Sequence, residues 1–439
     1  MDSRWKQDCN MPNFHAQSKD IHTDILIIGG GIAGVLCAYQ LHQAGADYVL
    51  AEAKTICSGI TKNTTAKITS QHGLIYDRMI RRFGGNYAKL YLQANEEALD
   101  RYRTLCRNID CDFEEKDAFV YSINDGDTIG KEYRALQKIG FPATMKSNLP
   151  LPFSVAGALM FPKQAQFHPL KFLSAISSKL NILEHTPVRK LVGLSAHTDF
   201  GKIRAKKIIV ATHFPFLNKH GLYPIKLYQH RSYVIALENA PDVGGMYVDK
   251  DLKGLSFRNY GDLLLLGGGG HRTGKQGGAW QELLEFTKRN FPEATVRCQW
   301  ATQDCMSLDG IPYIGRYSPG TDGLYVATGF NKWGMTTSMV AATILCDMVQ
   351  GKKNPYASVF SPSRSILRPQ LAVNGIETLT NLLTPTRRRC PHLGCALKWN
   401  KYEHSWDCSC HGSRFTESGK LIDNPATGDL KNMQKGNRL

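Results

Sequence analysis

The stretch that decides the fold lies near the start of the chain, at residues 24–52, and reads DILIIGGGIAGVLCAYQLHQAGADYVLAE. Residues 25–28 are apolar, mostly β-branched and followed by glycine, which predicts a buried parallel strand. The segment after the glycines is apolar at helical spacing and closes at Gly45, which predicts a helix. Residues 48–50 predict a second strand. This order of strand, glycine turn, helix and strand is typical of a nucleotide-binding unit.

The glycines of the turn have the spacing that a dinucleotide requires. Gly29, Gly31 and Gly34 give G-x-G-x-x-G. The first permits the tight turn, the second admits the pyrophosphate, and the third lets the helix pack on the strand. Glu52, after the second strand, is placed to accept a hydrogen bond from a ribose hydroxyl. Because strand, helix and acid accompany the motif, we favour a nucleotide cofactor over an ordinary glycine-rich loop.

Length and composition set the broad class. The 439 residues exceed one ordinary core, so we expect two or more domains. The hydrophobic content of 42% is a globular value, and no apolar run reaches the ~18 residues of a membrane span. The first ten residues lack an apolar signal region, so the expected location is cytoplasmic. The formal charge of +16 is dispersed apart from Arg387, Arg388 and Arg389, and it predicts no nucleic-acid partner.

Several other segments before residue 350 have recognisable patterns. Residues 1–22 are polar and unpatterned, and we expect a tail on the surface. The hydroxyl-rich residues 57–69 suit a loop along the cofactor, although such residues favour turns in any case. Residues 269–276, GGHRTGKQ, nearly match a phosphate loop, but Gln276 lacks the hydroxyl that binds magnesium, which argues against an ATPase. Further strands are expected at 119–123, 158–160, 206–212, 232–237, 263–266 and 324–329, and helices at 87–106, 279–289 and 335–349.

The predicted strands belong to two sheets. Residues 206–212 form a β-branched run that ends in small residues, as expected of the nucleotide sheet. Before it, Val188 follows a proline and is expected to place a backbone group beside an adenine. We assign residues 232–237 and 263–266 to a second sheet that faces the substrate. The strand at 324–329 ends at a glycine turn before a helix, and such a turn supplies N–H donors for a flavin ring.

The C-terminal part of the chain changes character. Prolines interrupt short apolar pieces between residues 354 and 389, as in a linker. Beyond it, Cys390 and His392 form C-x-H, and Cys408 and His411 form C-x-x-H. Two thiolates and two imidazoles suit either tetrahedral zinc or a Rieske [2Fe-2S] centre, in which the thiolates hold one iron and the imidazoles the other.

Two further cysteines bear on the choice of metal. Cys395 and Cys410 lie within the same two loops, where a disulfide would tie the loops together. They favour the iron-sulfur centre, with zinc as the alternative.

Residues 386–432 resemble the Rieske modules of quinol-oxidising type, because CPHLGC and CSCHGSRF match their two cluster loops. The resemblance implies that Cys390 and Cys408 hold one iron, that His392 and His411 hold the other, and that Ser413 donates a hydrogen bond to cluster sulfur. The sequence departs from the pattern at Ser409, where such loops often carry proline. The run before Cys390 is also short, so we expect a reduced base sheet.

Residues 23–350 resemble the glycine/D-amino-acid oxidase family of FAD enzymes through GGGIAG, NTTAKITSQHG, DGIPYIG and ATGFNKWGMTT. The resemblance implies an α/β fold in which a Rossmann-like FAD-binding domain interleaves with an antiparallel substrate domain, followed by a small all-β Rieske-like module. Cys305 does not match the family's attachment cysteine, so we expect noncovalent FAD. The implied FAD contacts are Gly29, Gly31, Ile32, Ala33, Gly34, Glu52, Thr64, Thr65, Ala66, Val188, Ala211, Thr212, Gly329, Lys332, Gly334, Met335 and Thr336.

The expected organisation is a tail at 1–22, an oxidoreductase unit at 23–353, a linker at 354–385 and a Rieske module at 386–433. The expected function is oxidation of an amine or amino acid by hydride transfer to FAD, with single electrons passed through the cluster to an external acceptor. The residues allow the reverse flow equally well.

Three side chains are candidates for the chemistry. Lys67 lies in the flavin loop and would polarise the ring, Arg231 would hold a carboxylate, and His271 ends a substrate-domain strand. The alternative function is a non-enzymatic electron carrier or redox sensor. An enzyme should show an enclosed cavity lined by the strands between residues 230 and 275, whereas a carrier should expose the ring edge.

Overall fold

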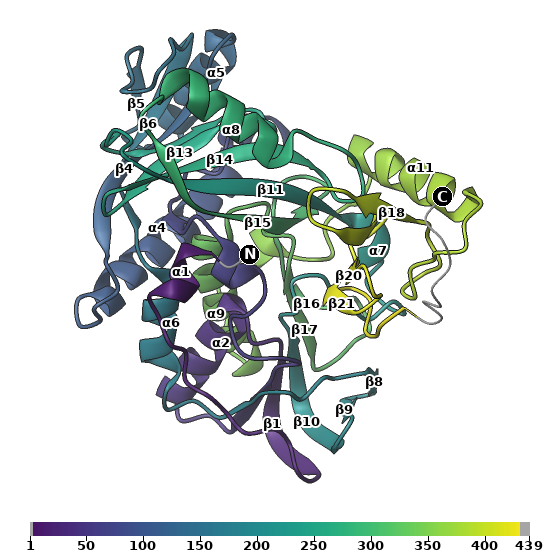
Figure 1. The fold of residues 1–439 in the computed structure, drawn as a ribbon. Coiled ribbons are helices and arrows are strands. Elements are labelled where there is room, and N and C mark those ends of the chain that lie inside the picture. The colour runs from purple at the N-terminus through teal and green to yellow at the C-terminus, as the bar shows by residue number, and fades with distance from the viewer. Residues whose placement is uncertain (1–2, 431–439) are drawn as a thin grey trace.

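The computed structural model describes residues 3–430, which form two large sheets and a small C-terminal sheet (Figure 1). The first large sheet has eight strands, with β16-β17-β10-β1-β2-β7 in hydrogen-bonded order and the β8–β9 hairpin attached to β10. Its strands are β1 (Ile21–Ile28), β2 (Tyr48–Ala51), β7 (Ile182–Leu183), β8 (Lys190–Val192), β9 (Ser195–Thr198), β10 (Gly201–Val210), β16 (Tyr313–Arg316) and β17 (Leu324–Thr328).

The centre of this sheet is parallel, as the β-branched sequence runs predicted. Strand β1 pairs with β2 on one side and β10 on the other, and β10 pairs with β17, all in parallel register. Helices α2 (Ile32–Gln43) and α9 (Gly334–Val349) pack against each other beside it. Both are mostly buried. The carboxyl ends of β1 and β17 therefore lead into the N-termini of two buried helices, which is the geometry of a Rossmann-like unit.

Close backbone approach explains two glycines of the first turn. Gly29 has φ of +108°, and a Cβ there would lie 2.6 Å from the carbonyl oxygen of Ala211. A Cβ on Gly34 would lie 1.9 Å from the carbonyl oxygen of Gly29. Neither position has room for a side chain, so the helix meets the strand and β10 meets the turn only because these residues are glycine.

The second large sheet has nine strands in the order β15-β11-β14-β13-β12-β4-β6-β3, with β5 beside β6. Its pairs are antiparallel except β4 with β12. Helix α8 (Ala279–Asn290) packs against β14 and β11 (Figure 1). The strands are β3 (Lys67–Ile68), β4 (Glu114–Ser122), β5 (Thr144–Lys146), β6 (Gly157–Gln166), β11 (Leu227–Glu238), β12 (Met246–Asp249), β13 (Ser256–Tyr260), β14 (Leu263–Arg272) and β15 (Thr295–Ser307).

The chain passes repeatedly between the two large sheets, so each is built from separate sequence segments. This interleaving confirms the predicted architecture. The remaining helices before residue 350 are α1 (Arg4–Gln7), the 3-10 helix η1 (Ile60–Asn63), α3 (Tyr76–Phe83), α4 (Gly85–Cys106), α5 (Gly126–Lys138), α6 (Pro169–Ser177) and α7 (Tyr223–Lys226).

The N-terminal segment is not the surface tail that its polarity predicted. Trp5 on α1 is fully buried. Its Nε1 donates a hydrogen bond to the carbonyl oxygen of Thr64 at 2.7 Å, and its ring contacts Tyr260 with centroids 4.8 Å apart. The guanidinium of Arg258 lies 5.4 Å from the Trp5 ring. The prediction was wrong because burial of one large aromatic ring is enough to anchor an otherwise polar segment.

The stretch interpreted as a linker contains two helices, α10 (Ala357–Phe360) and α11 (Pro369–Leu383). Pro369 occupies the first turn of α11, where a missing N–H costs nothing, so this proline marks a helix start. After α11 come the four antiparallel strands of the small sheet, β18 (Leu397–Asn400), β19 (Ser405–Cys408), β20 (Arg414–Thr416) and β21 (Leu421–Asp423).

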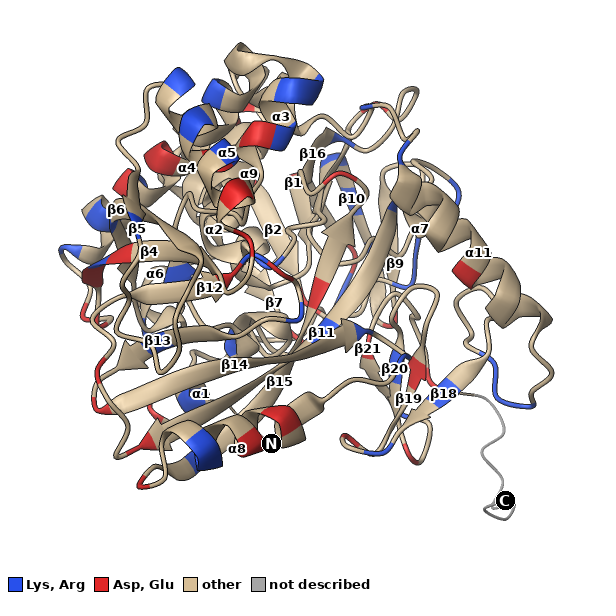
Figure 2. Ribbon diagram, turned by 90° about the horizontal axis from the view of Figure 1, so that it is seen from above, with Lys and Arg blue, Asp and Glu red and all other residues tan. Residues whose placement is uncertain are grey.

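Charged side chains of both signs are spread over the molecule (Figure 2). Within residues 3–430, no helix combines the length and apolarity needed to cross a bilayer.

Replacing Gly34 by alanine tests the helix–strand contact. Because its Cβ would meet backbone that cannot rotate away, we expect Gly34→Ala to lower the free energy of unfolding by about 3 kcal/mol. Urea titration followed by circular dichroism measures it. Gly85→Ala is the control, since a Cβ at Gly85 meets nothing within 4 Å. Equal stability of the two variants would contradict the packing argument.

Candidate functional site

A cavity of about 1450 Å³ extends from the glycine turn to the second sheet and the C-terminal module. One wall comes from the turn after β1 and from the loop that contains η1. Another comes from β11 and β15, which pair in antiparallel register along their length. The C-terminal module closes the cavity with residues of the turn between β18 and β19 and of the segment from β21 to Asp429. Three parts of the chain that are distant in sequence therefore line one continuous cavity.

Most of the predicted cofactor residues lie on this cavity. Those that line it are Gly29, Gly31, Ile32, Ala33, Glu52, Thr64, Thr65, Val188, Ala211, Thr212, Gly329, Lys332, Gly334 and Met335. Three are outside the lining. Gly34 packs on Gly29, Ala66 accepts a hydrogen bond from Arg258, and Thr336 donates one to the carbonyl oxygen of Thr69 at 3.0 Å. Their direct contact with a cofactor stays a prediction.

Glu52 closes the glycine turn from the neighbouring strand. Its Oε2 accepts the N–H of Gly30 at 2.6 Å, and its Oε1 accepts the N–H of Lys54 at 2.8 Å. Burial raises the pKa of this carboxyl group, while the two N–H donors oppose the change. Each carboxylate oxygen keeps a second lone pair. The geometry is thus compatible with the predicted ribose contact. It also shows that Glu52 stabilises the glycine turn.

Lys67 lies on the cavity wall, at the start of β3. Burial lowers its pKa to about 7, and the nearby charge of Arg258 acts in the same direction. Its Nζ lies 3.3 Å from the hydroxyl oxygen of Thr65. A lysine with this pKa gains or loses its charge near neutral pH. Such a residue suits the predicted role of polarising the flavin ring.

The structure gives Arg231 a partner that the sequence did not predict. Its Nε donates to Oε1 of Glu403 at 3.0 Å, and its Nη2 pairs with Oε2 of the same carboxylate. The guanidinium is 2% exposed. The guanidinium of Arg231, which was predicted to hold a substrate carboxylate, is therefore already paired with the carboxylate of Glu403. His271 is outside the cavity lining, and its Nε2 lies 2.9 Å from the hydroxyl of Tyr233, which does line it.

Asp304 is a cavity residue that sequence reasoning missed. It lies on β15 beside Gln303, and burial raises its pKa to about 6, with the charges of Lys332 and Arg231 opposing the rise. Burial also lowers the pKa of Lys332, which Asp304 opposes. The signal in the sequence was that Asp304 is the one acidic residue of its strand, five residues before Asp309. Its position on the cavity depends on the pairing of β11 with β15.

The C-terminal module brings the four predicted metal ligands together. Cys390 and Cys408 are buried and their thiols are hydrogen-bonded to each other. The imidazole centroids of His392 and His411 are 4.9 Å apart. Buried Nδ1 atoms of both rings lack a protein partner within the described residues. Buried nitrogens without partners are costly, and a metal ion satisfies them, so the donor set fits a Rieske cluster.

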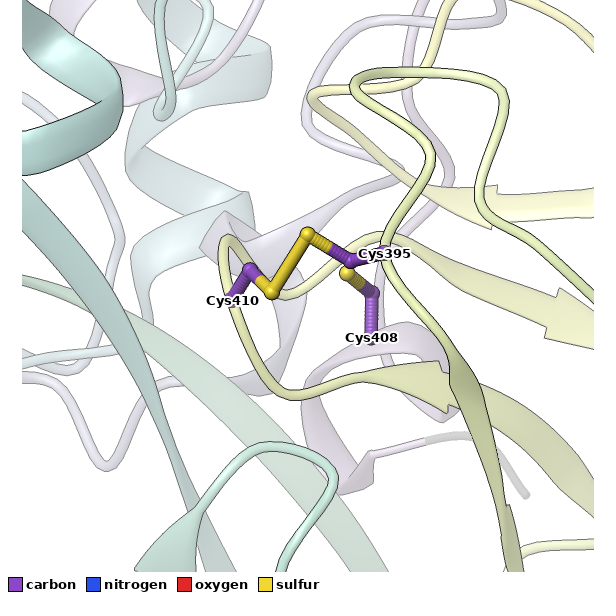
Figure 3. Close-up of side chains that lie close together, drawn as sticks. All are labelled: Cys395, Cys408 and Cys410. Carbon is purple, nitrogen blue, oxygen red and sulfur yellow. A yellow bond between two sulfur atoms is a disulfide. The ribbon is translucent and has the colours of Figure 1, made fainter. Parts of the chain in front are cut away.

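The two additional cysteines form the predicted disulfide. Cys395 and Cys410 are bonded to each other, and the sulfur of Cys408 lies beside them (Figure 3). Since both disulfide sulfurs are already used, Cys408 is left to pair with Cys390. Ser413 is hydrogen-bonded to Cys390, and its contact with cluster sulfur stays a prediction.

The histidine face of the module rests on the flavin-binding body. The ring of Phe214 lies 6.3 Å from that of His392 and 6.0 Å from that of His411. Nε2 of His392 lies 2.7 Å from Oδ1 of Asn218, an acceptor, which leaves Nδ1 as the nitrogen with the free lone pair. The amide of Gln303, a cavity residue, donates to the carbonyl oxygen of Gly412 at 2.9 Å. The second cluster loop is thus one side chain away from the cavity.

The negative charge of Glu403 joins the C-terminal module to the body through ion pairs with Arg231 and Arg414. A conservative substitution tests this contribution. Glu403→Gln leaves Arg231 and Arg414 without their shared anion, so we expect a loss of about 3–5 kcal/mol in the free energy of unfolding. The measurement is thermal and urea unfolding of the purified protein. The exposed Lys420–Asp429 pair provides the control, because Lys420→Met should change stability by less than about 1 kcal/mol. A similar loss in both variants would show that burial of the network is unimportant.

Comparison with known proteins agrees with this geometry. The family model described as FAD dependent oxidoreductase matches residues 24–348, and the Rieske [2Fe-2S] domain model matches residues 377–434. A protein of Bacillus subtilis (strain 168) named as the Rieske 2Fe-2S iron-sulfur protein YhfW is 37% identical over 97% of this chain and 96% of its own length.

Two solved structures share the fold of the larger unit. Glycine oxidase from Geobacillus kaustophilus superposes with a TM-score of 0.67 at 19% identity, over 79% of this chain and 100% of that one. L-Proline dehydrogenase from P. horikoshii gives 0.66 at 16% identity, over 80% and 98%. The family implies FAD, for which the cavity and glycine turn are suited, and the Rieske domain implies a [2Fe-2S] cluster. The chain belongs to the FAD-dependent oxidoreductases of the DAO family and carries a C-terminal Rieske [2Fe-2S] domain.

Proposed function

We propose that this oxidoreductase oxidises an amine or amino acid and that its Rieske domain exchanges the electrons with an external partner. FAD, when bound, accepts a hydride from the carbon that bears the amine, and a [2Fe-2S] cluster carries single electrons. The observation that carries the proposal is the cavity of about 1450 Å³ beside the glycine turn, walled by Arg231, Ser232, Tyr233 and Val234 of β11. A cavity that the second sheet lines together with the glycine turn gives a substrate a place beside FAD, which favours an enzyme over a carrier.

The structural neighbours support the same class of substrate. They are a glycine oxidase and an L-proline dehydrogenase, both of which act on amino acids. Their identity to this chain is below 20%, so the substrate is proposed from the cavity chemistry together with this likeness.

The ionisable side chains of the cavity suit an amine. Asp304 presents a carboxylate that attracts an ammonium group and takes a proton from it, which leaves the neutral amine needed for hydride loss. Its pKa of about 6 keeps it ionised at neutral pH. Lys67 and Lys332 line the same cavity and carry positive charge when protonated, although burial lowers the pKa of both. Their charges favour a substrate that also carries an anionic group, as an amino acid does.

Side-chain amides form hydrogen bonds between the body and the Rieske domain. Gln229 donates to the carbonyl oxygen of His411 at 3.2 Å, and its Oε1 lies 3.0 Å from Nε2 of His213. Asn424 donates to the carbonyl oxygen of Phe214 at 2.8 Å. These amides hold the second cluster loop next to the cavity. The residues permit electron flow in either direction, so direction has to be measured.

Anaerobic titration of the purified holoenzyme tests the proposed function. A panel of amines and amino acids is added in turn while flavin absorbance and the cluster signal in electron paramagnetic resonance are recorded. We expect flavin bleaching with at least one member, followed by cluster reduction. If no member of the panel bleached the flavin, the proposal of amine oxidation would be rejected. Cluster reduction by an added reductant, with later flavin reduction, would establish the reverse flow.

The pH dependence of binding tests Asp304. The carboxylate attracts an ammonium only when ionised, so we expect the apparent Kd of the reducing amine to rise about tenfold for each unit of pH below about 6. Rapid mixing under anaerobic conditions gives this Kd from the concentration dependence of flavin bleaching. Asp304→Asn should remove the acid limb and weaken binding at neutral pH.

Asp249→Asn is the matched control for Asp304→Asn. Asp249 also lines the cavity, but its Oδ1 accepts the N–H of Asp251 at 2.9 Å. The control should keep the acid limb. If the Asp249 variant lost the acid limb and the Asp304 variant kept it, the pH dependence would come from Asp249, which would contradict the proposed role of Asp304.

A further inference from the structure

Helix α11 exposes most of its apolar side chains and buries two asparagines. Val373, Ile376, Leu379 and Leu383 are 51%, 66%, 59% and 72% exposed. With 3.6 residues per turn these four fall within about 120° of arc, on the side opposite Asn374 and Asn381. Both asparagines are 1% exposed. An ordinary surface helix has the reverse pattern.

The buried side of α11 is well held, so the exposed side is not a misplaced core face. The amide of Asn374 donates to the carbonyl oxygen of Ile225 at 3.2 Å and accepts from Arg272 at 2.9 Å. The carbonyl oxygen of Asn381 accepts the N–H of Ala396 at 3.0 Å. Glu377 pairs with Lys275 at 2.7 Å. The hydrogen bonds and the ion pair on the polar side fix which face of the helix points outward.

Exposed apolar residues also stand before and after the helix in the sequence. Leu367, before it, is 77% exposed, and Leu393 in the first cluster loop is 42% exposed. Arg389 joins the helix to that loop by donating to the carbonyl oxygens of Leu382 and Gly394. Of the seventeen large hydrophobic side chains exposed in the described part of the chain, six fall between residues 367 and 383. An exposed concentration of this kind marks an interaction surface.

Basic residues flank this apolar face. Arg387, Arg388 and Arg389 begin four residues after the end of α11, and Lys398 and Lys401 lie on and just after β18. The one charged residue within α11 is Glu377, which Lys275 neutralises, and the helix is uncoloured in Figure 2 apart from that position. A second copy of the chain packed here would bring two arginine clusters together, which opposes self-association. The charge pattern instead matches an anionic surface.

We propose that the α11 face binds the surface of an anionic phospholipid bilayer. The helix would lie in the interface plane, with Val373, Ile376, Leu379 and Leu383 among the upper acyl chains. The exposed side chains of Arg387 and Lys398 would lie at the lipid phosphates, whereas Arg388 stacks on Trp406 and Arg389 donates to carbonyl oxygens of the protein. Short interfacial helices bind in this way without crossing the membrane. The first cluster loop, which holds Leu393, would then rest at the lipid boundary.

Co-sedimentation of the full-length holoprotein with lipid vesicles tests the proposal. We expect binding to vesicles of phosphatidylglycerol in phosphatidylcholine, little binding to phosphatidylcholine alone, and weaker binding at high salt. Ile376→Asp and Leu379→Asp should each reduce the partition coefficient about tenfold. Since both side chains are exposed, the variants should keep their flavin absorbance and circular dichroism.

Val192→Asp is the control, because Val192 is 57% exposed on β8, away from α11, and its variant should bind vesicles as the unchanged protein does. Failure of the unchanged protein to sediment with the anionic vesicles would overturn the proposal. So would equal binding by the α11 variants, or conversion of a lipid-free dimer into a monomer by these same substitutions, which would assign the face to a second copy. No substrate is present in this assay, so its outcome is independent of the proposed amine oxidation.

Discussion

The seating of the Rieske domain on the flavin-binding body depends on the buried charges around Glu403. Its carboxylate is 10% exposed and is shared between Arg231 of the body and Arg414 of the domain, while Arg414 also pairs with Asp407 and Asp423. Removing such charges from water is expensive, and the cost is offset only when every donor and acceptor keeps its partner. A network of this kind tolerates little displacement, so it fixes the orientation of the domain more than it adds to net stability.

That orientation decides what the cavity is. Without the domain, the space beside the glycine turn would be open along the side that Tyr402 and Ile422 now close. The body and the domain therefore form one site together, although their family models end and begin 29 residues apart. The amides of Gln229 and Gln303 extend the same arrangement to the cluster loop. Two units with separate evolutionary relatives here share one interior.

The sequence predicted what is local and missed what depends on distant contacts. The turn at Gly29 and the ligand spacing at Cys390 follow from short motifs whose geometry has few solutions. Arg231 and Glu403 are 172 residues apart, and no local pattern pairs them. The cavity position of Asp304 likewise depends on the register of two strands. For α11, the period indicates a helix, but the usual rule that apolar residues face inward gives the wrong side.

Trp5 has a practical consequence for anyone who prepares the protein. Its indole N–H holds the carbonyl oxygen of Thr64, and Thr64 is part of the loop that lines the cavity. Helix α1 near the start of the chain therefore contacts the loop that lines the cavity. An affinity tag fused ahead of this segment lies close in sequence to Trp5, so flavin content should be compared with and without the tag. Recombinant samples for spectroscopy are best freed of N-terminal fusions.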